Sequence, residues 1–111
     1  MGNDYVYTII YVTCSDKSEA EKIGKHILEK RLAVCINIIP DMTSFYFWPP
    51  REDKIESGQE CILLIKAKFQ NYQDIESEIL KVHSYENPAI LAIPILALSK
   101  KYSDWLDLES N

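Results

Sequence analysis

The chain has 111 residues, of which 47% are hydrophobic and 26% are charged, and its formal net charge is -5. This length suits one domain with a real core, and the composition is that of a soluble globular protein rather than a disordered one. The negative charge argues against a nucleic-acid partner, and the absence of a long apolar run predicts no membrane insertion.

Cysteine usage points to a reducing environment. The three cysteines are Cys14, Cys35 and Cys61, an odd number at wide spacing with no CxxC pair. This pattern argues against a disulfide scaffold and against a preformed zinc finger. No basic segment followed by an apolar core opens the chain, so we expect no secretory signal and a cytoplasmic protein. Residues 1–4 are expected to be a flexible terminus.

A strand and an amphipathic helix are predicted first. Residues 5–13 are dense in β-branched and aromatic residues and predict a strand. Asp16 with Glu19 three residues later predicts a helix start. The helix stripe that follows has a 3.6-residue period and consists of Ala20, Ile23, Gly24, Ile27, Leu28 and Arg31. This helix should cover one face of a sheet.

Residues 32–48 predict a long second strand that is interrupted at Pro40. In its second half, Thr43, Phe45 and Phe47 alternate with Ser44, Tyr46 and Trp48. Both faces therefore carry large rings, which a small domain cannot easily bury, so we expect one face to meet another chain.

The rest of the chain predicts one more strand, a helix, a final strand and a tail helix. Residues 55–67 form the third strand, whose apolar centre predicts burial on both faces. A helix over 71–82 should bury a stripe formed by Tyr72, Ile75, Ile79 and Leu80. After a loop, residues 89–96 predict a fourth strand that contains Pro94, and residues 99–108 predict a short helix with Tyr102, Trp105 and Leu106 on one side.

The element order is β-α-β-β-α-β plus a tail helix, which predicts a single α+β domain over 1–111 of the split-βαβ, ferredoxin-like class. Proline cannot donate to a ladder, so the strands with Pro40 and Pro94 belong at sheet edges. An antiparallel sheet of order 4-1-3-2 places them there. Because the second strand is long and nearly uncharged, we expect its edge to pair with another subunit.

Five motifs together resemble the CutA divalent-cation tolerance protein family. They are residues 32–37, residues 44–48, Glu60 with Lys66, residues 83–90 and residues 102–105. The resemblance covers about 5–108 and implies a ferredoxin-like homotrimer, similar to PII-type signalling proteins and linked to tolerance of copper and other divalent metals. The chain departs from the family pattern at Pro49-Pro50, where a glycine-containing turn is common, and at Ser84 and Ala89, where proline and glutamate are typical.

Cys35 and His83 are the candidate metal ligands, because thiolate and imidazole suit Cu²⁺ and similar ions. The alternatives are a small hydrophobic role for Cys35 within its strand and a buried, helix-ending role for His83. Cys61 is expected in the core. Cys14 precedes a helix N-terminus, which could stabilise its thiolate.

A second candidate is a ligand-binding cleft. Its residues are Trp48, Glu60, Lys66, Tyr85, Tyr102 and Trp105. Lys66 ends a buried strand and needs a partner or access to water. Glu60 is roughly 20 Å away along the same strand, so a partner must come from a neighbouring strand or subunit. An interface ion pair and an anion-binding pocket both remain open, and the aromatic residues are read as packing anchors.

No GxSxG, HExxH, P-loop or GxGxxG motif is present, so we predict that the chain is not an enzyme. The first functional hypothesis is a cytoplasmic homotrimer that binds Cu²⁺ or another divalent metal in metal tolerance. The second is a PII-like signalling or interaction module that binds a small anion or a partner protein in an intersubunit cleft lined by Lys66, Trp48 and Tyr85. A small enzyme using that cleft is the third.

Overall fold

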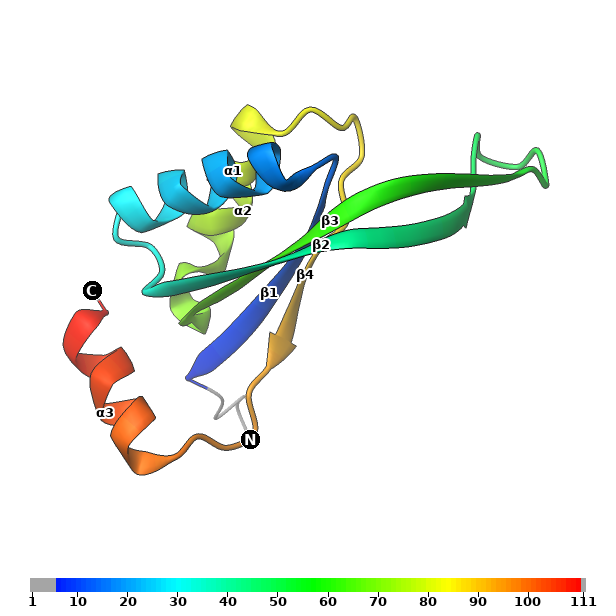
Figure 1. Ribbon diagram of the computed structural model, residues 1–111. Helices are drawn as coiled ribbons and strands as arrows, with labels where there is room; N and C mark the ends of the chain where they lie inside the picture. The colour runs from blue at the N-terminus through cyan, green and yellow to red at the C-terminus, as the bar shows by residue number, and fades with distance from the viewer. Residues whose placement is uncertain (1–5, 111) are drawn as a thin grey trace.

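The computed structural model describes residues 6–110, and its elements follow the predicted order (Figure 1). They are β1 (Tyr7–Cys14), α1 (Lys17–Glu29), β2 (Cys35–Phe47), β3 (Ile55–Lys68), a 3₁₀ turn (Phe69–Asn71), α2 (Tyr72–Val82), β4 (Ile90–Pro94) and α3 (Lys100–Glu109). The expected flexible terminus over 1–4 and the expected strand start at position 5 lie outside the described residues.

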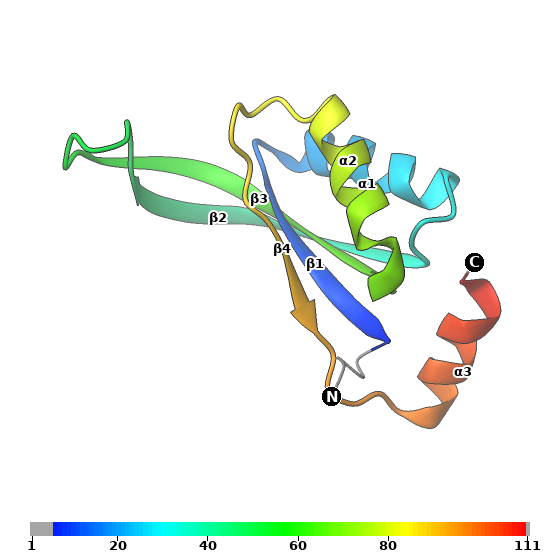
Figure 2. The ribbon, with the colours of Figure 1, turned by 180° about the vertical axis from the view of Figure 1, so that it is seen from behind.

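The four strands form one antiparallel sheet of order β2-β3-β1-β4, which is the predicted order counted from the other edge. Helices α1 and α2 lie together on one face of this sheet (Figures 1 and 2). The edge strands carry Pro40 and Pro94, as predicted. Pro94 ends β4 instead of interrupting it, so this strand is shorter than the predicted 89–96.

The core lies between the sheet and the two long helices. Its fully buried side chains alternate along β1 and β3 and follow one stripe of each helix: Ile10, Val12, Cys14, Cys61, Leu63, Ile65, Ile23, Ile27, Ile75 and Ile79. Cys61 is therefore a core residue, as predicted. The prediction that β3 is buried on both faces is wrong for the single chain, because Ile62 and Leu64 face away from α1 and α2 and are only partly buried.

Gly24 allows α1 to approach the sheet closely. A Cβ atom at this position would lie 2.3 Å from Cδ1 of Ile36 and 3.2 Å from Cδ1 of Leu63. Neither distance leaves room for a methyl group at ordinary carbon–carbon contact, which is about 3.5–4.0 Å. The glycine on the predicted stripe is thus explained by packing.

The second half of β2 and the first half of β3 form a hairpin that projects beyond the rest of the sheet (Figure 1). It projects because β1 ends at Cys14, opposite Cys61, so β3 has only β2 beside it before that point. Phe45 and Phe47 on this hairpin are 73% and 69% exposed.

A β-bulge interrupts β2 where the sequence predicted an irregularity. Ile39 pairs with Ile62, but the next pair is Met42 with Glu60, so β2 has one residue more than β3 in this interval. The bulge contains Asp41, whose φ is 62°. Such an extra residue shifts the alternation of side chains in the rest of the strand.

Two helix-stripe assignments are wrong at their ends. Helix α1 stops at Glu29, and Arg31 follows with a φ of 60° and an exposed side chain that pairs with Glu109. Leu80 is 53% exposed, so it does not belong to the buried stripe of α2, which contains Ile75 and Ile79. The tail helix buries Leu106 completely, whereas Trp105 is 42% exposed.

Among residues 6–110 there is no helix that is long and apolar enough to cross a membrane.

Candidate functional site

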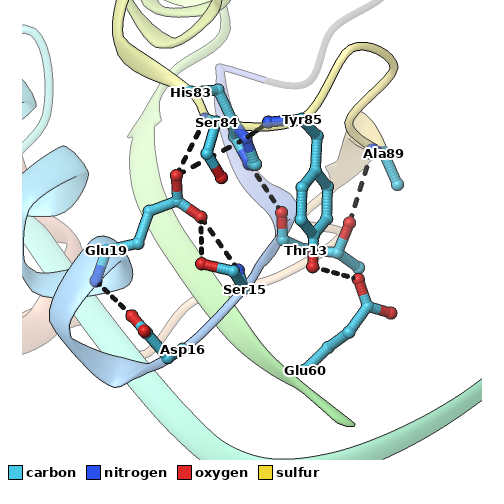
Figure 3. A network of polar contacts seen from close by, with 9 residues as sticks. All are labelled: Thr13, Ser15, Asp16, Glu19, Glu60, His83, Ser84, Tyr85 and Ala89. Carbon is cyan, nitrogen blue, oxygen red and sulfur yellow. Dashed lines mark hydrogen bonds and ion pairs between the residues drawn. The ribbon is translucent and has the colours of Figure 1, made fainter. Parts of the chain in front are cut away.

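The start of α1 and the loop after α2 are tied together by Glu19 (Figure 3). Asp16 caps the helix by accepting the Glu19 N–H at 2.8 Å, which confirms the predicted start. Oε1 of Glu19 accepts bonds from the N–H and hydroxyl of Ser15 at 2.8 and 2.9 Å, and Oε2 accepts the N–H of Ser84 at 2.8 Å. Burial alone would raise the pKa of Glu19, but the bonds from Ser15 and Ser84 outweigh it and lower that pKa to about 2.

Ser84 stands where the family pattern has proline, and this difference has a structural role. A proline has no N–H, so it could not donate the bond that Glu19 receives from Ser84. The loop after α2 is thereby fixed to the first turn of α1 by a contact that the sequence pattern of the family does not predict.

His83 ends α2 and is buried, with a side chain that is 1% exposed. Its Nε2 lies 2.7 Å from the carbonyl oxygen of Thr13, which can only accept, so Nε2 carries the proton and donates. Nδ1 accepts the backbone N–H of Tyr85 at 3.0 Å. These two bonds engage both ring nitrogens, which is the helix-ending, buried role considered for His83.

Cys14, Glu19 and His83 form a cluster of potential metal ligands, with one donor atom from each residue within 4.8 Å of the others. A thiolate, a carboxylate and an imidazole are the donor types that Zn²⁺ and Cu²⁺ accept, so the donor set fits a borderline divalent cation. The expectation that the helix N-terminus stabilises a Cys14 thiolate is wrong. Burial, followed by the charge of Glu19, raises the pKa of Cys14 to about 12. A cation here would replace the Cys14 proton and the bond from Tyr85 N–H to His83.

The structure does not bring Cys35 and His83 together within one chain. Cys35 is half-buried and lies opposite Lys66 on β3, whereas His83 contacts Thr13, which lies opposite Ile62. Four residues of an extended strand separate these two positions, a distance of about 14 Å. A site shared by both side chains would therefore need a second chain.

The six predicted cleft residues separate into two groups along β3. Near the end of the strand, Nζ of Lys66 lies 3.2 Å from the Tyr102 hydroxyl and 5.3 Å from the centre of its ring, and Tyr102 in turn contacts Trp105. The tail helix thus supplies the partner of Lys66 that we expected from a strand or subunit. Near the middle of β3, the Tyr85 hydroxyl donates to Glu60 at 2.7 Å. Burial, followed by that bond to Glu60, raises the pKa of Tyr85 well above its usual range.

Each group contributes residues to one pocket. A pocket of about 800 Å³ is lined by Trp48, Glu60 and Tyr85 together with hairpin and loop residues. A smaller pocket of about 410 Å³ lies between the end of α1 and α3 and is lined by Trp105. Lys66 lines neither. A single cleft that contains Lys66, Trp48 and Tyr85 would have to include a neighbouring chain.

Comparisons with known proteins agree with the fold and with the family resemblance of the sequence. The family model for the CutA1 divalent ion tolerance protein matches residues 8–109. The divalent-cation tolerance protein CutA of Archaeoglobus fulgidus is 39% identical over 102 residues, covering 92% of this chain and 96% of that protein. Its counterpart in Thermus thermophilus is 33% identical over 98 residues, covering 88% and 92%.

Solved structures give the same result. The periplasmic divalent cation tolerance protein CutA of Archaeoglobus fulgidus superposes with a TM-score of 0.86 at 39% identity, covering 93% of this chain and 97% of that one. CutA1 of Shewanella sp. SIB1 superposes with a TM-score of 0.89 at 29% identity, covering 97% and 98%. Because the family model matches residues 8–109 and these relatives are covered over nearly their whole length, the chain belongs to the CutA1 divalent ion tolerance protein family.

Proposed function

We propose that this chain serves divalent-cation tolerance by binding a borderline divalent cation, with Cu²⁺ or Zn²⁺ as the candidates, through Cys14, Glu19 and His83. The observation that carries the proposal is the approach of three donor groups from three segments to within 4.8 Å. His83 is common to this set and to the predicted ligand pair, whereas Cys14 takes the place of Cys35. Among divalent metals, Cu²⁺ has the highest general affinity for nitrogen and sulfur ligands.

The test is calorimetric titration of the reduced protein with chelator-buffered Zn²⁺ and Cu²⁺, supported by Cd²⁺ titration, in which a thiolate ligand gives a charge-transfer absorption band. We expect saturable binding and an affinity at least tenfold weaker in Cys14→Ser and in His83→Gln, since each variant loses one ligand. Cys35→Ser is the matched control, because this thiol lies outside the cluster. If metal binding persists in Cys14→Ser but is lost in Cys35→Ser, the ligand is Cys35 and not Cys14. If the titrations show no heat of binding, the role in metal tolerance is indirect.

We further propose that the functional form is a cytoplasmic homotrimer without enzymatic activity. Support for association comes from the hairpin, where Phe45, Phe47 and Ile55 are strongly exposed, and from the unpaired edge of β2. Support for a reducing compartment comes from the free thiols of Cys14 and Cys35. Sedimentation equilibrium tests the trimer, which must give three times the chain mass, and localisation of a tagged chain tests the compartment.

The alternative proposal is a PII-like module that binds a small molecule or a partner protein in an intersubunit cleft. The observation in its favour is the 800 Å³ pocket beside Trp48, Glu60 and Tyr85. An anion in that pocket would need a basic side chain from another chain, such as Lys66, since the lining residues of this chain include none.

A further inference from the structure

We propose that the pocket between the β2–β3 hairpin and the loop after α2 binds a small organic cation, an alkylammonium or arylalkylammonium ion. Its volume of about 800 Å³ falls within the usual range of small-molecule sites, about 300–1,000 Å³. Figures 1 and 2 both place this loop, drawn in yellow, at the end of the sheet from which the hairpin projects. This proposal names a ligand class for the pocket of the PII-like alternative, so it rests on that alternative and not on the metal site.

Aromatic rings form one part of the lining. Four of these rings come from the hairpin, namely Phe45, Tyr46, Phe47 and Trp48, and all four are exposed, with Trp48 the least exposed at 40%. Gly58 lies beside the Tyr46 hydroxyl, at a distance where even an added Cβ atom would be in ordinary contact, 3.5 Å away. Faces of tryptophan and tyrosine attract ammonium and guanidinium groups through the ring quadrupole.

The fifth ring of the lining, that of Tyr85, is held in place by contacts described above. The hydroxyl of Tyr85 donates to Glu60, and its backbone N–H donates to the buried His83. The ring itself lies 4.8 Å from the imidazole, measured between ring centres. Tyr85 therefore stands as a fixed wall, so little side-chain freedom is lost when a ligand binds beside it.

The charges of the lining select for a cation. Glu60 and Glu86 line the pocket, and no lysine, arginine or histidine of residues 6–110 does so. Tyr85 occupies Oε2 of Glu60, while Oε1 makes no hydrogen bond within the same range of the chain. Carboxylates combined with aromatic walls suit an organic cation better than a metal ion, because the rings supply no metal ligands.

Fluorescence offers a direct test, since the chain has two tryptophans and only Trp48 lines this pocket. In the Trp105→Phe variant, we expect 2-phenylethylammonium and tetramethylammonium to change the Trp48 emission in a saturable way. 2-Phenylethanol, which lacks the charge, should bind at least tenfold more weakly, and 3-phenylpropionate should not bind. Equal affinity for the alcohol, or tighter binding of the carboxylate, overturns the proposal.

Substitutions then locate the site, with calorimetry as the readout. Glu60→Gln preserves an acceptor for Tyr85 but removes the charge, so ammonium affinity should fall about three- to tenfold. Trp48→Leu should cause a similar loss. Glu56→Gln is the matched control, because this carboxylate lies two positions beyond Gly58 on the same strand and pairs with Lys54 outside the lining. An equal loss in the Glu56 variant contradicts the proposal, as does unchanged binding in both pocket variants.

Two further outcomes separate the proposed cation binding from metal binding and from association of the chain. Saturating Zn²⁺ should not displace 2-phenylethylammonium, because Cys14, Glu19 and His83 do not line the pocket. If a second copy of the chain fills the pocket, none of the probes binds to the associated protein, and this result overturns the proposal while leaving the metal site untouched.

Discussion

The close packing of α1 on the sheet makes a specific prediction for Gly24→Ala. An added methyl carbon would lie 2.3 Å from Cδ1 of Ile36, more than 1 Å inside ordinary contact, and 3.2 Å from Cδ1 of Leu63. Overpacking of a core costs about 1–3 kcal/mol, whereas replacing glycine by alanine inside a helix gains about 1 kcal/mol. We therefore expect the free energy of unfolding to fall by up to about 2 kcal/mol.

The clash can be relieved by changing its partner. Ile36→Val deletes Cδ1 and alone should cost about 0.5–1.5 kcal/mol through the lost burial. In the double variant the methyl group of the alanine at position 24 would occupy the space that Cδ1 of Ile36 has left. The overpacking cost of the alanine should therefore disappear, while its gain in helix propensity should remain. The two changes should thus be coupled by about 1 kcal/mol or more, as expected for residues in contact.

These values can be tested by urea unfolding of the unmodified protein, the two single variants and the double variant, all at one fixed chain concentration. The quantity to compare is the free energy of unfolding. Lys25→Ala is the control for helix propensity, because this neighbouring side chain is exposed. The packing argument is refuted if Gly24→Ala stabilises the protein by the propensity gain regardless of the residue at position 36.

Three other predictions concern the tail helix and the hairpin. Burial, followed by the bond to Asp107, raises the pKa of Tyr7 from 10.0 to about 12. The protonated Tyr7 therefore contributes stability that is present below pH 10 and is lost as the pH rises toward 12. Tyr7→Phe should flatten this part of the profile of unfolding free energy against pH. Tyr102→Phe removes the hydroxyl that Lys66 contacts and should lower the protection of α3 amides against hydrogen exchange by about 0.5–1.5 kcal/mol, with unchanged protection in β3. Phe47→Asp should leave the monomer fold intact, since the ring is exposed, but shift sedimentation toward a single chain; an unchanged assembly would exclude this face from the interface.

The topology could be predicted because periodicity and proline placement are local signals with few solutions. Pro40 and Pro94 marked the edge strands, and Asp16 marked the start of α1. Where the prediction failed, tertiary context decided: Arg31 fits the α1 stripe by spacing, yet the helix ends before it, and Leu80 fits the α2 stripe yet remains exposed.

The candidate site could be predicted only in part. His83 was identified as a ligand candidate, but its neighbours come from other segments, with Cys14 ending β1 and Glu19 in the first turn of α1. The signal for Glu19 was present in the helix start, where its role was read as local capping. Its second oxygen reaches Ser84, and no local pattern predicts a contact between residues so far apart in the chain.

The bulge at Asp41 joins two stretches of β2 whose side-chain alternation differs by one residue. Ile39 and Met42 lie on either side of it, opposite Ile62 and Glu60, so Tyr46, and not Phe45, shares a face with Ile39 and Glu60. Deletion of Asp41 would remove the bulge but leave Met42 opposite Glu60, so the rings of the hairpin would keep their faces while the strand lost the bend and added twist that a bulge gives. The direction in which the hairpin projects can therefore change without any change in which rings share a face.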